Sequence, residues 1–293
     1  MFICFSLATG LWLLQQLLWL LAFAYRNTGS GPSSTAVARP LPVRTEGVHA
    51  CHLTIALRRP WKVMPGQYVY VTLPGATRHG LGRLQAHPYM VAWAESDEHG
   101  ADKTIVLLVE RRHGFSSDIL GSDRPLEAIV DGPYGGGQSL DRFDKVLFIA
   151  NGIGIAAHLL SVRHLLEAHE AKTARVRRIS LIWLLETRGK RSSISDGHRL
   201  TGNADQEAWA IDFLEHLLEM DERSGRKILN VLLFVPCKTE GPALGPLDFT
   251  EDERCRRLYR PDKTLDLTLY TRGEWSAEAG SMAVSGASYP STF

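Results

Sequence analysis

The sequence predicts a mixed fold of three parts: an apolar N-terminal helix, an antiparallel β-barrel, and an α/β region built on a parallel sheet. Three observations lead to it. Residues 3–25 contain no charged side chain, residues 53–130 hold short apolar runs between Pro, Gly and charged turns, and from residue 146 onward apolar runs alternate with segments of helical periodicity. We expect a transmembrane helix at 1–26, a linker at 27–46, the barrel domain at 47–141 and the α/β domain at 142–293, incomplete at its C-terminal end.

Length and charge exclude several classes of protein. A chain of 293 residues is long enough for two ordinary domains. Lys plus Arg number 33 and Asp plus Glu 32, so no bulk charge favours a nucleic-acid partner, and we expect none. The four cysteines lie far apart without a C-x-x-C pair, which favours reduced thiols and predicts neither a disulfide framework nor a metal site: Cys4, Cys51, Cys237 and Cys255.

The uncharged N-terminal run has the length of a membrane span. Its 23 residues, at about 1.5 Å per residue, cover roughly 35 Å, which exceeds a hydrocarbon core of about 30 Å. Trp12, Trp19 and Tyr25 suit the membrane interfaces, and Arg26 is the first basic residue after the run, which predicts a single span with the globular part in the cytosol. A secretory signal peptide cleaved near residues 22–24 is an alternative, disfavoured because no basic segment precedes the run. A buried helix of a soluble protein is a second alternative.

The next segment predicts first a tether and then a barrel. Residues 27–42 are rich in Gly, Ser, Thr and Pro, a composition that buries too little apolar area to order itself. Short strands then recur at the spacing of a small antiparallel barrel. The residues His87-Pro88-Tyr89-Met90 stand between two of these strands, and spacing alone favours a turn with buried aromatic rings there. The expected strands are 53–57, 68–73, 105–109 and 128–130.

The α/β region opens with a strand, a glycine turn and a helix. Residues 146–150 form a continuous apolar run typical of a strand buried on both faces. Gly152 and Gly154 follow, and apolar residues then recur at helical spacing from Ile155. This order lets free backbone N–H groups and the positive end of the helix dipole meet a phosphate. A tight turn without a ligand is the alternative.

A second apolar strand, residues 179–185, ends at an acidic residue. Glu186 at that position suits a ribose hydroxyl, and the basic residues Arg188, Lys190 and Arg191 suit a 2′-phosphate. A solvated charged loop is the alternative. An amphipathic helix at 209–220 and a third strand at 228–235 complete an alternation that predicts a parallel sheet with crossover helices.

Five motifs in register resemble one family. In their order and spacing, between about residues 10 and 285, they are similar to the flavin and nicotinamide half of the fungal ferric reductases, which are akin to the NADPH oxidases. The motifs are Pro65-Gly66-Gln67-Tyr68, His87-Pro88, Gly114-Phe115-Ser116, Gly132-Pro133-Tyr134-Gly135 and Gly152-Ile153-Gly154-Ile155-Ala156.

The resemblance implies an FAD-binding barrel and a Rossmann-like, nicotinamide-binding domain of the ferredoxin reductase type. It also implies a preceding membrane bundle that holds haem, and a location in the plasma membrane. Electrons would pass from NADPH to FAD as a hydride and then singly through haem to a ferric chelate or similar acceptor, since flavin accepts two electrons and releases them one at a time. A superoxide-forming oxidase is an alternative, because it uses the same cytosolic half.

The resemblance also implies which residues contact the cofactors, although it identifies no catalytic side chain. On the flavin side, the ring system would lie against His87, Pro88, Tyr89 and Met90, and the FAD pyrophosphate near Arg111, Arg112, Gly114, Phe115 and Ser116. Gly132, Pro133, Tyr134 and Gly135 would join the domains under the nicotinamide, while Gly152, Gly154, Ile155, Ala156, Glu186 and Arg188 would hold the rest of NADPH.

Departures from the family predict impaired activity. Met90 stands where relatives usually carry Thr or Ser, so no hydroxyl can reach the flavin edge, and Glu110 stands where Lys or Arg is usual. Residues 1–26 contain no His, so this part ligates no haem, and residues 286–293 replace the family's Cys-Gly-Pro segment. We therefore expect a chain shortened at both ends whose last strand is unfinished. A catalytically impaired relic that acts only by association with intact relatives is an alternative.

Overall fold

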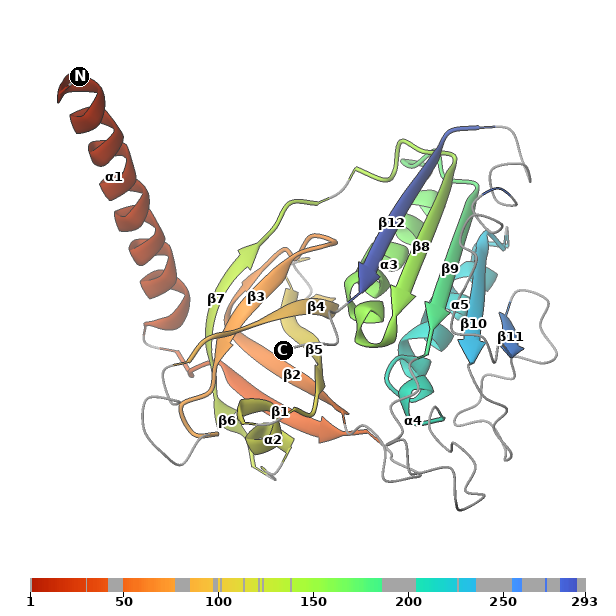
Figure 1. The fold of residues 1–293 in the computed structure, drawn as a ribbon, viewed down its shortest axis with the longest axis horizontal. Coiled ribbons are helices and arrows are strands. Elements are labelled where there is room, and N and C mark those ends of the chain that lie inside the picture. The colour runs from red at the N-terminus through yellow and green to blue at the C-terminus, as the bar shows by residue number, and fades with distance from the viewer. Residues whose placement is uncertain are drawn as a thin grey trace, which may run out of the picture.

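The computed structural model has the predicted three parts, which follow one another from N- to C-terminus (Figure 1). Helix α1 projects from one side of the barrel, and the parallel sheet lies on the opposite side of the barrel. The residues that the structure describes are 2–29, 31–41, 50–76, 85–96, 100, 102–112, 114–120, 122, 124–137, 139–185, 204–225, 227–235, 255–259, 272 and 280–288.

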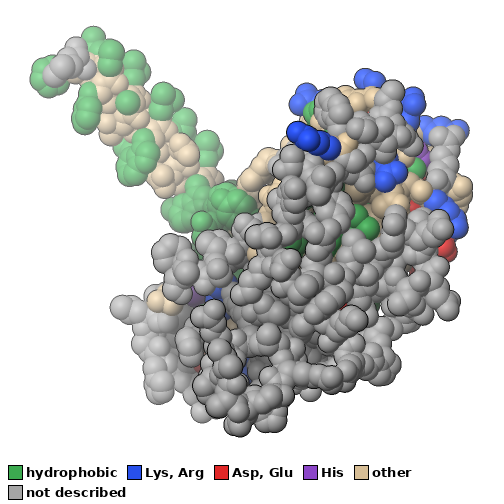
Figure 2. All heavy atoms as spheres, turned by 45° about the vertical axis from the view of Figure 1, so that its right-hand side comes forward, with side chains coloured by type: hydrophobic (Ala, Val, Ile, Leu, Met, Phe, Trp, Pro, Cys, Tyr) green, Lys and Arg blue, Asp and Glu red, His purple; other side chains and the backbone are tan. Residues whose placement is uncertain are grey.

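Helix α1 (Phe2–Asn27) is long and apolar enough to cross a membrane, with a mean hydropathy of 1.6 and no buried residue. Its hydrophobic side chains lie open along the helix (Figure 2). The C-terminal end of the helix is capped by the guanidinium of Arg58, which donates to the carbonyls of Asn27, Gly29 and Gly31. A cation at this position also complements the negative end of the helix dipole.

The first sheet is antiparallel, curled, and seven-stranded, in the order β6-β1-β2-β5-β4-β3-β7. The short helix α2 (Phe115–Leu120) follows β5. The strands are β1 (Thr35–Pro40), β2 (Ala50–Trp61), β3 (Tyr68–Thr72), β4 (His87–Ser96), β5 (Asp102–Glu110), β6 (Leu126–Glu127) and β7 (Ile129–Tyr134).

Two predictions for this sheet are wrong. Residues 35–40 lie inside the predicted tether but form β1, which pairs with both β2 and β6. Ala36 points into the barrel core and Val37 points outward, so the segment alternates as a strand does. The average composition of the segment conceals this local alternation. The segment that begins at His87 is not a turn: it opens β4 and pairs with β3, with Tyr68 opposite Met90.

The second sheet is parallel throughout, in the order β11-β10-β9-β8-β12. The predicted strands, the glycine turn and the amphipathic helix are confirmed. The strands are β8 (Lys145–Asn151), β9 (Arg178–Leu184), β10 (Leu229–Val235), β11 (Cys255–Tyr259) and β12 (Met282–Ser288); the helices are the 3-10 turn η2 (Gly152–Ile155), α3 (Ala156–Glu170), α4 (Ala204–Glu207) and α5 (Ile211–Arg223).

The last strand includes the first three residues of the segment that replaces the family's Cys-Gly-Pro motif. Strand β12 runs on to Ser288, and its residues pair one by one with β8 from Lys145 to Asn151. In this register Gly286 pairs with Ile149 and Ala287 with Ala150. The start of β12 is fixed by Asp144, whose carboxylate accepts hydrogen bonds from the backbone N (2.9 Å) and the hydroxyl (2.8 Å) of Ser281.

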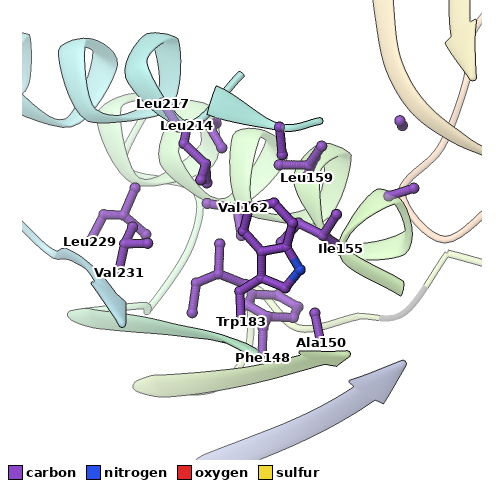
Figure 3. Packing of buried hydrophobic residues seen from close by; sticks show 14 of the residues in the cluster. Phe148, Ala150, Ile155, Leu159, Val162, Trp183, Leu214, Leu217, Leu229 and Val231 are labelled. Atoms are coloured by element: carbon purple, nitrogen blue, oxygen red, sulfur yellow. The ribbon is translucent and has the colours of Figure 1, made fainter. Parts of the chain in front are cut away.

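One hydrophobic core joins the two sheets. Phe148, Ile155 and Trp183 form its centre between the parallel sheet and helix α3 (Figure 3), and side chains of the barrel such as Trp93 belong to the same cluster. Two polar contacts cross the same boundary: His52 Nε2 lies 2.8 Å from the carbonyl oxygen of Trp209, and the guanidinium of Arg163 donates to the carbonyl of Ala94 at 2.6 Å. The two domains therefore present fixed walls to the space between them.

Candidate functional site

A cavity of about 480 Å³ lies between the barrel and the α/β domain. This volume falls within the roughly 300–1,000 Å³ typical of small-molecule and cofactor sites. The barrel contributes residues of β3, β4, β5 and α2, and the α/β domain contributes residues of η2, α3 and β12. A ligand there would touch both domains at once.

The start of β4 forms the barrel wall of the cavity. His87, Pro88, Tyr89 and Met90 all line it, as the family resemblance implies, and Tyr68 of β3 lies beside them. These four residues are partly or fully exposed, because only the residues of β4 that follow them are buried in the core. Their contact with a flavin, which the resemblance implies, stays a prediction.

His87 supplies a polar atom suited to a ligand. Its ring stacks on Phe115 with centroids 4.0 Å apart and planes at 17°. Burial lowers the pKa of His87, which keeps the imidazole neutral near pH 7. Its Nε2 is buried, and no described residue bonds to it. A buried polar atom without a protein partner costs free energy unless a ligand or water pairs with it, so the residues present fit a polar heterocycle such as a flavin.

The carboxylate that the sequence flags as unfavourable is neutralised. Glu110 lies at the end of β5, lines the cavity and is only 7% exposed. The guanidinium of Arg112 lies 3.4 Å from its carboxylate and also lines the cavity. Arg111 is exposed and does not contribute to the lining. Of the two arginines named from the sequence, Arg112 therefore offsets the negative charge.

Hydrogen bonds connect Arg112 and Gly114 to helix α2. Ser116 lines the cavity, and its hydroxyl accepts a hydrogen bond from the backbone N of Arg112 at 2.7 Å. Gly114 has φ +83°, which favours glycine, and its carbonyl accepts from Ser117 and Asp118 to start the helix. Gly114 shapes the turn without lining the cavity, whereas Phe115 and Ser116 reach it.

The glycine turn after β8 forms the opposite wall. Gly154 and Ala156 line the cavity, while Gly152 and Ile155 do not. Whether this turn binds the NADPH pyrophosphate stays a prediction. Ile155 is fully buried in the core, and the carbonyl of Gly152 accepts a hydrogen bond of 2.9 Å from the indole N–H of Trp183. Of the four residues named from the sequence, Gly154 and Ala156 thus line the cavity, and Gly152 and Ile155 hold the turn in the core.

Sequence reasoning missed several residues of the lining. Tyr68 and Ile153 stand inside quoted motifs but were assigned no contact. The others are apolar and belong to no motif, so only the alternation of a strand or the helical period could have indicated their faces. They are Leu108, Ala157 and Ala287.

The segment Gly132 to Gly135 does not line this cavity. The phenol of Tyr134 donates to Asp131 at 2.7 Å and accepts from the indole of Trp19 at 2.7 Å. Burial and the bond to Asp131 raise the pKa of Tyr134. Pro133 follows a cis peptide bond, and Gly135 has φ +86°. A contact of these residues with nicotinamide remains a prediction.

Two predicted residues, Glu186 and Arg188, lie outside the described part of the chain. Within the described ranges no group of three or more His, Cys, Asp or Glu side chains is placed to hold a metal ion. The lining of the cavity is mostly apolar and aromatic, and it contains one Arg–Glu pair, Arg112 and Glu110.

Comparison with known proteins agrees with this geometry. The profile of an FAD-binding domain matches residues 43–138. The probable cell surface ferric reductase kap2 of Aspergillus oryzae is 27% identical over 183 residues, which are 57% of this chain and 23% of the relative. Ferric reductase transmembrane component 4 of Saccharomyces cerevisiae is 28% identical over 120 residues, 39% of this chain and 15% of that protein. The chain thus spans less than a quarter of the length of these relatives.

A solved structure shares the fold. A mutant of the ferredoxin-NADP+ reductase from Plasmodium falciparum, crystallised with 2′P-AMP, superposes with a TM-score of 0.51 at 11% identity and covers 86% of each chain. At that identity the likeness concerns the fold alone. In sequence, residues 43–138 match an FAD-binding domain, and part of the chain is similar to fungal ferric reductases.

Proposed function

We propose that this chain is the dehydrogenase half of a ferric-chelate reductase, a membrane-anchored flavoprotein oxidoreductase. It would pass a hydride from NADPH to FAD and then single electrons towards haem and ferric iron. The observation that carries the proposal is the cavity of about 480 Å³ to which both domains contribute, with the wall from His87 to Met90 on one side and Gly154 and Ala156 on the other. Donor and acceptor rings bound to these two walls would face each other.

The residues of each wall suggest how the two nucleotides would be held. His87 and Phe115 offer stacked rings and a free buried nitrogen to the flavin, and Ser116 and Arg112 lie near the start of α2, where the FAD phosphates would approach. Flavin, when bound, supplies the exchange between a hydride and single electrons. Gly154 leaves room for a second nucleotide at the N-terminal end of α3, where the helix dipole favours an anion.

Helix α1 would anchor the protein in the membrane with the globular part in the cytosol. Its length, its hydropathy and Arg26 at its C-terminal end support that orientation. One relative is named as a cell surface protein and another as a transmembrane component, which supports the plasma membrane as the location. Haem would be ligated outside residues 2–27, since these contain no His, and a ferric chelate would be the acceptor.

A catalytically impaired protein is the second candidate. Met90 favours it, because this thioether lies in the cavity wall opposite Tyr68 and cannot donate a hydrogen bond to a flavin edge. Such a protein would bind FAD but accept hydride slowly.

A spectroscopic titration separates these candidates. The full chain is purified in detergent, mixed with FAD and then with NADPH without oxygen. A protein-bound flavin spectrum that NADPH bleaches supports the reductase, a bound flavin that stays oxidised supports the impaired protein, and failure to bind FAD refutes both. Ala157→Glu puts a carboxylate on the α3 wall and should prevent bleaching while FAD still binds. Ala171→Glu, at the exposed end of the same helix, is the control and should change neither.

A further inference from the structure

Helix α1 is attached to the barrel at its last turn, by contacts to strand β7. The side-chain amide of Asn27 donates to the carbonyl of Val130 and accepts from its backbone N, both at 2.9 Å. The guanidinium of Arg26 donates to the carbonyl of Gly132. These bonds join the end of the helix to the backbone of β7, in the part of β7 that pairs with β3.

A second attachment lies two turns earlier on the helix. The indole N–H of Trp19 donates to the phenol oxygen of Tyr134 at 2.7 Å, and the Trp19 ring stacks on Phe23 at 5.6 Å. Trp19, Phe23 and Arg26 follow one another at spacings of four and three residues, so they share one face of the helix. The two attachments are about 10 Å apart along the axis. Together they fix the direction of the helix as well as its end.

The second attachment continues into the cavity wall. Tyr134 also donates to Asp131 at 2.7 Å, so its hydroxyl is held from both sides. Its ring lies 5.8 Å from the ring of Tyr68, and the two residues are register partners in β7 and β3. Tyr68 lines the cavity directly, and Met90 lies opposite it on β4. A contact path therefore leads from the apolar helix through two tyrosines to the barrel wall.

We propose that Trp19 is a positioning residue for the cavity: by fixing the phenol of Tyr134 it holds Tyr68 in the barrel wall, so that helix α1 and this wall keep one relative orientation. Trp19 and Tyr134, which connect the helix to the barrel, are 115 positions apart in the sequence. A change in the tilt of the helix would thus reach the cavity through side chains, and not only through the linking backbone. The proposal rests on the proposed function in one respect, because it assumes that a flavin binds against this wall.

Amide hydrogen exchange of the full chain in detergent tests the proposal without any cofactor. One hydrogen bond contributes about 0.5–1.5 kcal/mol, so Trp19→Phe should speed exchange in the segments of β3 and β7 by about 2- to 10-fold. Trp12→Phe is the matched control: Trp12 lies seven residues earlier on the same helix face and is 57% exposed. It should leave both segments unchanged. Unchanged exchange in Trp19→Phe, or an equal rise in Trp12→Phe, would overturn the proposal.

FAD affinity provides the second arm. In the same preparations, Trp19→Phe should weaken FAD binding by about 2- to 10-fold while Trp12→Phe keeps the wild-type Kd. An equal Kd in all three proteins would overturn the link to the cavity. If the wild-type chain binds no FAD, the proposed function fails, and the exchange rates of β3 and β7 still decide whether Trp19 positions the wall.

Discussion

Replacing Trp183 by Phe tests whether one buried hydrogen bond sets the shape of the nucleotide-facing turn. The indole N–H of Trp183 donates to the carbonyl of Gly152 at 2.9 Å, and both residues are buried. Phe keeps an aromatic ring in the core but removes the donor. The carbonyl of Gly152 then loses its bond to the indole, which costs about 1–3 kcal/mol, and the smaller ring leaves a void worth about 1 kcal/mol more.

The combined loss of about 2–4 kcal/mol should be visible in thermal unfolding. For a domain of this size, each kcal/mol corresponds to roughly 2–4 °C, so we expect the Tm of the α/β domain to fall by about 5–12 °C. The turn that carries Gly154 would also lose its fixed backbone, so the Kd for 2′-phospho-AMP should rise by about 5- to 10-fold. Differential scanning calorimetry and isothermal titration calorimetry measure the two effects.

Phe148→Leu is the control for lost packing. Phe148 is fully buried in the same cluster and has no polar atom, so its replacement creates a void without leaving a carbonyl unpaired. We expect about 1 kcal/mol of destabilisation and an unchanged Kd for 2′-phospho-AMP. If Trp183→Phe changes Tm and Kd no more than Phe148→Leu does, the indole hydrogen bond does not hold the turn.

Three further predictions concern single side chains. Met90→Thr places a hydroxyl in the cavity wall and should tighten FAD binding by about 5-fold in a flavin fluorescence titration, whereas Met90→Leu should not. Burial lowers the pKa of His158 from 6.5 to about 4. Below pH 6.5 the unfolded chain therefore protonates this imidazole while the folded protein does not, and the free energy of unfolding should fall by about 3 kcal/mol between pH 6.5 and 4. Urea unfolding across that range checks the slope, which His158→Gln should flatten. Burial raises the pKa of the Cys51 thiol from 9.0 to about 12, so mass spectrometry should find it unalkylated by iodoacetamide at pH 8 until the barrel unfolds; labelling of the native protein would contradict this.

Local patterns were sufficient to predict the elements whose period is strong. The apolar run of β8, the glycine turn and the spacing of α3 follow one another in the sequence, so their order alone indicates a phosphate-facing helix start. The wall from His87 to Met90 was found through the family resemblance and not through periodicity, which favoured a turn. Strand β1 was missed because its pairing partners, not its composition, make it a strand.

Roles that depend on distant partners were not predictable. The sequence contains no signal for the bond between the Trp19 indole and the Tyr134 hydroxyl, or for the bond between the Trp183 indole and the carbonyl of Gly152. The cofactor contacts expected of Tyr134 and Gly152 stay predictions. Each of these bonds joins groups that the chain brings close only after folding, and a linear pattern contains no record of that distance.

The place of β12 beside β8 has a consequence for how the protein is made. Strand β8 begins at Lys145, but its outer neighbour begins only at Met282, and Asp144 joins the two through Ser281. On the ribosome the barrel strands emerge together and can pair early, whereas the parallel sheet lacks one edge until almost all of its residues have been synthesised. During that interval one side of β8 offers unpaired backbone groups to other chains. Slowing translation late in the message should therefore promote aggregation through the parallel sheet and spare the barrel.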